Sequence, residues 1–305
     1  MRLLVVGGSG FLGGFVLREA SRRGHETVAL ARSPAAAQAV AGLGAQPVTG
    51  NLDDAAELDR VFAAARCDTL LNLASLGFGH APAIIAAAGE TGISRAVFVS
   101  TTALTTTLAA PAKRVRLAAE QRIRGSALKW TILRPTMIYG APGDRNLSRL
   151  LAVLRRAPLL PVPGGGRHLQ QPVHVADVAD AVLNAAQRPA TAGMTYDVAG
   201  PRPLTLAELL RTSAQAIASR TRFVPVPLTP LVTLARGYER FSQHPQIRAE
   251  QLLRLAEDKA FPIDSAARDL GFDPRPFATG IRAEAQAMGL APPGSPYGPP
   301  HGPLQ

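Results

Sequence analysis

A cluster of glycines directly behind a short apolar segment constrains this chain more than any other feature. Leu3–Val6 is followed by GGSGFLGG, in which Gly8, Gly10 and Gly13 match a GxGxxG spacing. Glycines permit a tight turn, a close approach of backbone to a pyrophosphate, and close packing of a following helix whose N-terminus offers free N–H groups. A glycine-rich turn without a ligand is the alternative. We expect a dinucleotide to bind through Gly7, Gly8, Ser9, Gly10, Phe11, Leu12 and Gly13.

The first 140 residues alternate short apolar segments with segments of helical length. This alternation is typical of buried parallel strands joined by crossover helices. Ser33-Pro34 predicts the start of one helix, and Asp53-Asp54 predicts the start of another. We therefore expect an α/β fold with a Rossmann-type doubly wound parallel sheet, in which the first strand is internal. The expected strands are Leu3–Val6, Glu26–Ala31, Gln46–Val48, Thr69–Leu73, Ala96–Ser100 and Thr131–Leu133.

Beyond Gly140 the alternation becomes irregular. We expect a dinucleotide-binding domain at residues 1–140, a smaller substrate region interlocked with it at 141–290, and a disordered Pro/Gly-rich tail at 291–305. In the second region, loops such as Pro158–Gly166 separate the elements, and prolines interrupt the apolar stretch Pro225–Ala235. The elements expected there are helices at Arg145–Arg156, Ala176–Ala186, Thr205–Ala218 and Ala249–Asp258, and strands at Pro172–Val175 and Thr195–Val198.

The residue after the second expected strand discriminates between the two nicotinamide dinucleotides. An acidic residue there holds the ribose 2′-hydroxyl of NAD, whereas a guanidinium suits the 2′-phosphate of NADP. This chain has Arg32, which lies 22 residues after Gly10. We therefore expect NADP to be preferred over NAD, with a solvated surface arginine as the alternative.

Composition excludes several classes of protein. The 305 residues contain one cysteine, Cys67, and six scattered histidines, so we expect no disulfide framework and no metal site. The net charge of +11 divides into +6 for residues 1–140 and +5 for residues 141–305. An excess spread in this way indicates a general arginine bias or a small anionic partner rather than nucleic acid. No segment resembles a signal peptide or a membrane span, so the cytoplasm is expected. The oligomeric state stays open.

Several segments together resemble the short-chain dehydrogenase/reductase superfamily in its extended and atypical branches. The likeness covers roughly residues 1–290 and is greatest to NAD-dependent epimerase/dehydratase-like proteins, and to relatives that include a nucleotide-binding accessory subunit of respiratory complex I. The segments are GGSGFLGG at 7–14, GNLDD at 50–54, NLAS at 72–75, VFVSTTA at 97–103, TILRPTMIYG at 131–140 and QPVHVADVADAV at 171–182.

The resemblance implies roles for individual residues. Thr102 takes the place of the catalytic Ser/Thr of the family, although a polar residue there can equally satisfy backbone. Arg116 stands where the family has a lysine that holds the nicotinamide ribose. The cofactor contacts implied by the other segments are Asn51 and Leu52 beside the adenine, then Leu73, Ala74, Ser75, Ser100, Thr101 and Pro135.

The chain departs from the family at its catalytic pair. The family uses a tyrosine as proton donor and a lysine four residues later, but none of the four tyrosines here has such a lysine. The expected positions hold Ala112 and Arg116. A methyl group transfers no proton, and a guanidinium is a poor acid near neutral pH. Lys113 is adjacent and is either an alternative donor or a solvated lysine.

Two functions follow from these residues. One is an NADP-dependent reductase or epimerase-like enzyme with a degenerate site, acting on a carbonyl, a sugar nucleotide or another anionic small molecule. The alternative is a non-catalytic, NADP-binding structural or redox-sensing subunit. The glycine loop, Arg32, Thr102 and the large second region favour the enzyme. The missing tyrosine and lysine count against the enzyme and favour the binding subunit.

Overall fold

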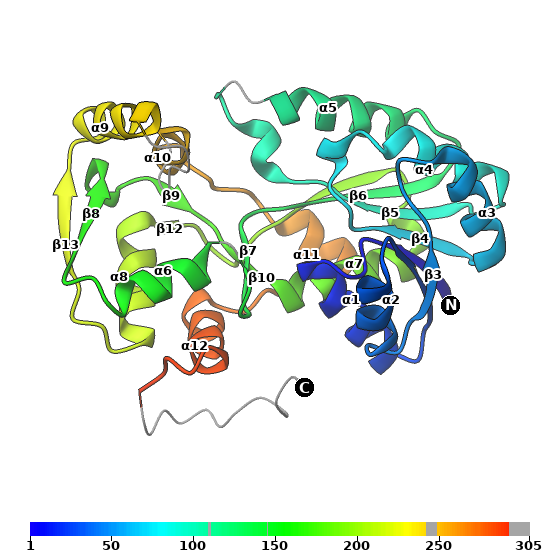
Figure 1. The fold of residues 1–305 in the computed structure, drawn as a ribbon, viewed down its shortest axis with the longest axis horizontal. Coiled ribbons are helices and arrows are strands. Elements are labelled where there is room, and N and C mark those ends of the chain that lie inside the picture. The colour runs from blue at the N-terminus through cyan, green and yellow to red at the C-terminus, as the bar shows by residue number, and fades with distance from the viewer. Residues whose placement is uncertain (109–110, 145, 242–248, 293–305) are drawn as a thin grey trace. The chain divides into compact units, whose positions relative to one another are not determined.

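A seven-stranded parallel sheet forms the centre of the first of two units (Figure 1). A computed structural model describes residues 1–108, 111–144, 146–241 and 249–292. The strand order is β3-β2-β1-β4-β5-β6-β11, and β1 pairs in parallel with both β2 and β4. This confirms the doubly wound sheet and its internal first strand. The strands are β1 (Arg2–Val6), β2 (Glu26–Ala31), β3 (Gln46–Thr49), β4 (Thr69–Asn72), β5 (Arg95–Val99), β6 (Lys129–Pro135) and β11 (Met194–Val198).

Local sequence explains where several helices of this unit begin. The Ser33 hydroxyl accepts a hydrogen bond from the Ala36 N–H at 3.2 Å and caps α2, and the Asp54 carboxylate caps α3 in the same way. The helices are α1 (Phe11–Arg22), α2 (Pro34–Ala41), α3 (Ala55–Ala65), α4 (Ala81–Glu90), α5 (Pro111–Arg124), α7 (Val175–Gln187) and α11 (Asp264–Leu270), with short 3-10 turns η1 (Leu76–Phe78), η2 (Thr102–Thr105) and η4 (Pro189–Thr191).

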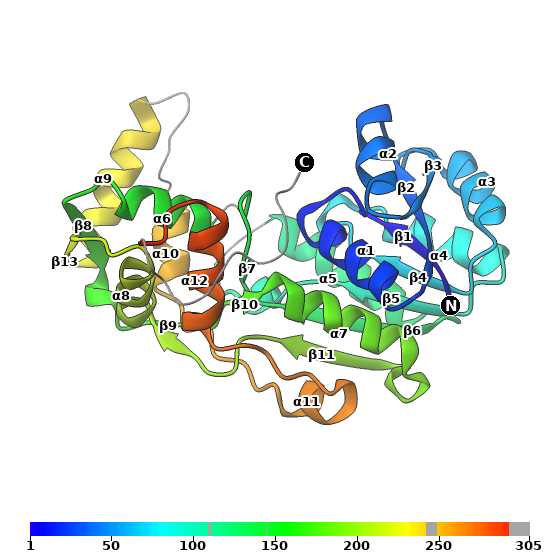
Figure 2. The ribbon, with the colours of Figure 1, turned by 90° about the horizontal axis from the view of Figure 1, so that it is seen from below.

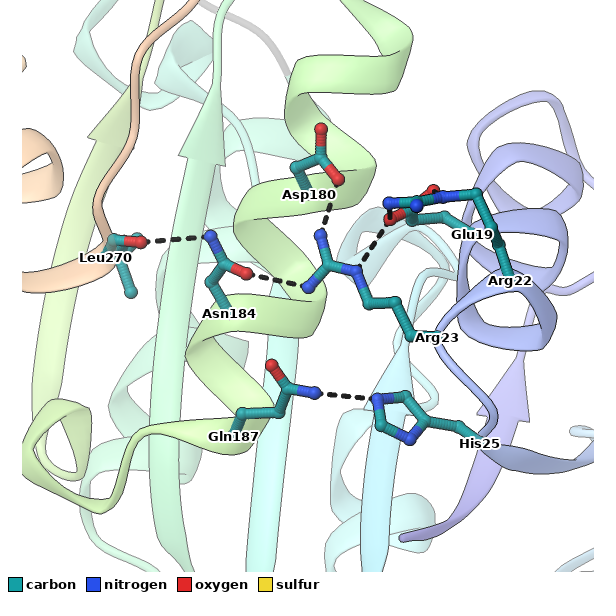
Figure 3. Close-up of polar contacts among 8 residues, drawn as sticks. All are labelled: Glu19, Arg22, Arg23, His25, Asp180, Asn184, Gln187 and Leu270. Carbon is teal, nitrogen blue, oxygen red and sulfur yellow. Dashed lines mark hydrogen bonds and ion pairs between the residues drawn. The ribbon is translucent and has the colours of Figure 1, made fainter.

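Helices α1 and α7 lie side by side against the sheet (Figure 2) and are joined by polar contacts around Arg23 (Figure 3). The Arg23 guanidinium donates to Glu19 at 2.6 Å, to Asp180 at 2.5 Å and to the Asn184 side-chain oxygen at 2.7 Å. The Asn184 amide donates in turn to the Leu270 carbonyl of α11. These contacts fix the C-terminal end of the helix whose N-terminus follows the glycine loop.

Arg95 is an exception in a core made mainly of Leu, Val, Ile and Ala. It begins β5 one residue before the predicted start and is 9% exposed. Its guanidinium donates to the hydroxyls of Thr131 and Thr191 at 2.7 and 2.8 Å and to backbone carbonyls that include Ala185 and Lys129. The buried cation is therefore held by neutral oxygens, and burial lowers its pKa.

The described residues of the second unit form helices and three two-stranded sheets. Its strands pair as β7 (Ile138–Tyr139) with β10 (Val173–His174), β9 (Leu169–Gln170) with β12 (Leu204–Thr205), and β8 (Leu159–Pro163) with β13 (Arg222–Val226). Its helices are α6 (Leu147–Leu154), α8 (Leu206–Ala216), α9 (Leu228–Phe241), α10 (Ala249–Leu255) and α12 (Phe277–Ala287), with a 3-10 turn η3 (Gly164–Gly166).

Two segments of this unit differ from the sequence-based expectation. The expected loop Pro158–Gly166 contains β8, and the proline-interrupted stretch Pro225–Ala235 contains the end of β13 and the start of α9. The prolines are tolerated because β8 and β13 form only a two-stranded sheet, and because Pro230 lies in the first turn of α9. The tail beyond residue 292 and Arg145 of the expected Arg145–Arg156 helix lie outside the described residues.

A buried carboxyl group lies among polar groups in the second unit. Glu284 of α12 is 0% exposed; it accepts hydrogen bonds from the Ser148 hydroxyl at 2.8 Å and from the Gly140 N–H at 3.0 Å. Burial, with Asp144 beside it, raises the pKa of Glu284 to about 8. Burial also lowers the pKa of His174 to about 3, assisted by the charge of Arg275. At neutral pH the fold therefore holds an uncharged acid and an uncharged histidine that both contact Gly140.

The chain passes between the two units several times. The first unit comprises Met1–Thr136, Val175–Val198 and Pro262–Asp273, and the second comprises Met137–His174, Ala199–Phe261 and Pro274–Gln305. This division changes the charge balance inferred from a single cut at Gly140. The first unit has 17 basic and 15 acidic residues, whereas the second has 16 and 7. The second unit thus carries +9 of the net +11.

Candidate functional site

The glycine loop forms a tight turn between the carboxyl end of β1 and α1, and it lies against the segment that follows β4. Gly7 has a φ of +86°, and a Cβ atom there would lie 2.8 Å from the backbone nitrogen of Ala74. A Cβ atom on Gly13 would lie 2.2 Å from the Gly7 carbonyl oxygen. Only glycine satisfies both positions without movement of the backbone. The close contacts of this loop, called the glycine cradle below, therefore require that Gly7 and Gly13 have no side chain.

The N-terminus of α1 opens directly from the glycine cradle. Gly10 is the N-cap and has extended backbone angles, and its own N–H donates to the Gly7 carbonyl at 3.1 Å. Because glycine has no side chain to cap the helix, the N–H groups of the first turn are left for another acceptor. The exposed Ser9 and the following Phe11 and Leu12 complete the predicted segment. The geometry fits the pyrophosphate of a dinucleotide.

Arg32 lies immediately beyond the end of β2, the neighbour of β1 on the other side from β4. Its side chain is exposed, and Ser33 after it caps α2. The structure thus places a guanidinium at the same sheet edge as the glycine loop. Its preference for a 2′-phosphate stays a prediction.

The loop after β3 and the loop after β4 are joined by a hydrogen bond. Nε2 of His80 lies 2.9 Å from an Asp53 carboxylate oxygen. Asn51 uses its own side-chain oxygen to accept the Asp53 N–H at 3.2 Å, and Leu52 packs against the core. Asn51 and Leu52 therefore shape the loop in which adenine contacts are predicted, although the Asn51 oxygen is already used locally.

Leu73, Ala74 and Ser75 follow β4 and are partly buried. The Leu73 N–H donates to the Val6 carbonyl at 2.8 Å, which ties this segment to the glycine loop. Ser75 accepts from the Gly77 N–H and so starts η1. Sequence reasoning missed Asn72, which is 1% exposed and whose Oδ1 has no hydrogen-bond partner within the described chain. A polar residue ending the apolar strand TLLN was the available signal.

The residues after β5 are ordered by local hydrogen bonds. Thr101 accepts from the Ala103 N–H at 3.1 Å and caps η2. Thr102 is 6% exposed, and its hydroxyl donates to the Pro135 carbonyl at 3.3 Å. Pro135, itself buried, therefore contacts Thr102 through its backbone. The hydroxyl proposed for chemistry is engaged with backbone, which was the other interpretation of this position.

Helix α5 presents the positions at which the family has its tyrosine and lysine. Ala112 is partly buried and has only a methyl group. The guanidinium of Arg116 lies against Gly77 of η1, because a Cβ atom on that glycine would be 3.2 Å from Nε of Arg116. Nζ of Lys113 donates to the Thr106 carbonyl just after η2. Arg116 and Lys113 thus reach the segments that follow β4 and β5 respectively.

Ser100 and Arg134 meet at a buried carboxylate that sequence reasoning also missed. Glu120 of α5 is 0% exposed and accepts from the Ser100 hydroxyl at 2.7 Å, from Arg134 at 2.6 and 3.0 Å, and from Arg124 at 2.8 Å. Burial raises the pKa of Glu120, but these hydrogen bonds and the two positive charges outweigh it and lower the pKa overall. Ser100 is therefore fixed by α5 as well as by its strand.

Within residues 1–108, 111–144, 146–241 and 249–292, no group of three His, Cys, Asp or Glu side chains is arranged to hold a metal ion. No helix in those ranges is long and apolar enough to cross a bilayer.

Comparisons with known proteins agree with this geometry. The family described as NAD(P)H-binding matches residues 7–189. A 4-hydroxy-2-methyl-3-oxo-4-farnesyl-3,4-dihydroquinoline-1-oxide ketoreductase of Stigmatella aurantiaca is 29% identical, over 89% of this chain and 92% of its own. The mitochondrial NADH dehydrogenase (ubiquinone) 1 alpha subcomplex subunit 9 of Arabidopsis thaliana is 26% identical, over 87% and 70%. A UDP-glucose 4-epimerase of Thermotoga maritima, solved with UDP-glucose, shares the fold with a TM-score of 0.74 at 16% identity, over 94% and 98%.

Proposed function

The chain belongs to the NAD(P)H-binding family, among atypical epimerase-like short-chain dehydrogenases/reductases, and from this premise we propose that it binds NADP(H) in preference to NAD(H) and reduces carbonyls slowly or not at all. One observation carries the proposal. Helix α5 offers a methyl group at Ala112, and the nearby Thr102 hydroxyl is buried against the Pro135 carbonyl. A proton supplied by a positioned side chain typically contributes about 10²–10⁴-fold to such a reaction.

The residues at the sheet edge have separate tasks in this proposal. Bound NADPH supplies the hydride. The glycine loop and the first turn of α1 hold the pyrophosphate, and Arg32 binds the 2′-phosphate. Leu73, Ala74 and Ser75 lie along the ribose, and Arg116 donates to it in place of the lysine. Asn51 and Leu52 line the adenine. The cytoplasmic location is likewise part of the proposal.

A second candidate is a ketoreductase that uses Lys113 as its proton donor. The observation that favours it is the hydrogen bond from the Lys113 ammonium to the Thr106 carbonyl, which holds the group at the segment that follows β5 and η2. The name of the Stigmatella relative supports a ketone as substrate. The epimerase fold neighbour supports a sugar nucleotide, an anion that would suit the strongly basic second unit.

The test restores the missing pair by the double substitution Ala112→Tyr with Arg116→Lys. NADPH oxidation is followed with a simple 3-oxo ester, and dinucleotide affinity is measured separately by calorimetry. We expect NADPH to bind the parent firmly with little turnover, and the double variant to be faster by about tenfold or more. Ala112→Phe with Arg116→Lys is the matched control, because it adds the same ring without the hydroxyl.

Rapid turnover by the parent would contradict the proposal. If that turnover were lost in Lys113→Met while NADPH affinity stayed constant, the second candidate would replace it. Failure of the parent to bind either dinucleotide would overturn both.

A further inference from the structure

An apolar stripe runs along the exposed side of α9 in the second unit. Pro230, Leu234, Tyr238 and Phe241 follow one another at intervals of four, four and three residues, which places them on one side of the helix. Leu234 is 72% exposed, Tyr238 44% and Phe241 90%. The buried side of α9 is separate and contains Val232 and Ala235. A contiguous row of large apolar side chains exposed on a protein surface indicates a contact site.

The acidic and basic residues of α9 also lie in different surroundings. Its one acidic residue, Glu239, is turned to α10, where its carboxylate accepts the Ala249 N–H at 2.8 Å. Its two basic residues, Arg236 and Arg240, are exposed. At 3.6 residues per turn, Arg240 lies beside Phe241 at the border of the stripe and Arg236 lies farther round the helix. The exposed surface of the helix therefore carries an apolar stripe bordered on one side by positive charge, in a unit whose net charge is +9.

We propose that this face of α9 docks on the surface of an anionic lipid bilayer. A helix of 14 residues is about 21 Å long and can lie in the plane of the interface. Leu234, Tyr238 and Phe241 enter the boundary between headgroups and acyl chains, and the arginines extend toward lipid phosphates. Charge complementarity selects this partner over a second copy of the chain, whose own α9 presents the same positive charges.

The test is sedimentation of the full-length protein with vesicles. Equimolar phosphatidylglycerol and phosphatidylcholine is compared with phosphatidylcholine alone. We expect binding to the anionic vesicles, weakened by added salt. The double substitution Leu234→Ser with Phe241→Ser should lower the partition coefficient by about tenfold or more. Arg236→Gln with Arg240→Gln should lower it by about tenfold, and only for anionic vesicles.

Leu159→Ser is the matched control, because Leu159 is 56% exposed on β8 of the same unit, and it should bind as the parent does. Circular dichroism checks that each variant is folded. The proposal is overturned if the parent stays in the supernatant with both vesicles, or if the Leu234/Phe241 variant binds like the parent. It is also overturned if light scattering shows that the parent is a dimer, the Leu234/Phe241 variant is a monomer, and the parent does not bind lipid. None of these outcomes depends on dinucleotide binding.

Discussion

Two glutamates, one in each unit, are equally buried and have opposite ionisation states. Glu120 and Glu284 are both 0% exposed. Glu120 lies among Arg134, Arg124 and Ser100, so its pKa is lowered despite its burial. Glu284 lies beside another acid, Asp144, and its pKa is raised to about 8. Burial alone therefore does not decide the charge of a carboxyl group, because the charges of its neighbours do.

The difference has a structural meaning. In the first unit, a charged network ties Ser100 at the end of β5 to α5 and β6, close to the predicted cofactor contacts. In the second unit, a neutral acid joins α12 to Gly140 and Ser148. The first arrangement depends on arginines, and the second depends on a bound proton.

The largest expected effect comes from removing a cation from Glu120. Arg134→Met leaves a buried carboxylate without its bidentate partner, which typically costs about 3–5 kcal/mol. Arg124→Met removes a partner whose side chain is 39% exposed, and we expect a loss of about 1 kcal/mol or less. Denaturant unfolding measures both. Equal losses would mean that Glu120 is not held chiefly by Arg134.

The next prediction is that the same substitution, Glu to Gln, changes the free energy of unfolding in opposite directions at the two glutamates. Glu284→Gln replaces a protonated acid with a neutral amide that can donate to Asp144, so the free energy of unfolding should rise at pH 8. Glu120→Gln removes a needed charge and should lower that free energy by about 2–3 kcal/mol at pH 7. Two variants that shift stability in the same direction would contradict the comparison.

The pH profile tests the same point. The pKa of Glu284 rises from its ordinary value near 4.5 to about 8 on folding, so the folded state binds the proton more tightly. The contribution of Glu284 to the free energy of unfolding is then full below pH 4.5 and falls as pH rises, by roughly 3–4 kcal/mol between pH 5 and 8. Glu284→Gln should abolish this fall. His174, whose pKa drops to about 3, acts oppositely: stability is lost as pH falls below 6.5, and this limb should persist in the variant.

The comparison of the two units also shows which features could be predicted from the sequence. The bounds of β2 match the predicted Glu26–Ala31, because a buried parallel strand has an unbroken apolar pattern. Apart from Arg124, which lies one helical turn after Glu120, the partners of the two glutamates were not predictable in this way. Gly140 and Glu284 are 144 residues apart, and no local pattern connects them. The pairing of β8 with β13 was missed for the same reason, since each strand alone reads as a proline-containing loop.

The smallest expected effect concerns an arginine whose proposed partner is external. Arg134 has its carboxylate inside the fold, whereas Arg32 is exposed at the end of β2 and would complete its pairing only with a 2′-phosphate. A charge-assisted contact of this kind is worth about 1.5–3 kcal/mol. Arg32→Ala should therefore weaken NADPH binding by roughly tenfold or more, leave NADH nearly unchanged, and leave the unfolding free energy within about 0.5 kcal/mol of the parent.

Calorimetry with both dinucleotides measures the effect, and Arg60→Ala is the control. Arg60 is exposed on α3 of the same unit, so its removal changes the net charge by the same amount away from the end of β2. If Arg60→Ala weakened NADPH as much as Arg32→Ala, the general positive field of the unit would explain the preference. If Arg32→Ala weakened both dinucleotides equally, the 2′-phosphate would not be its partner. Arg32 binds the 2′-phosphate only if Arg32→Ala lowers the affinity for NADPH but not for NADH, and Arg60→Ala lowers neither affinity.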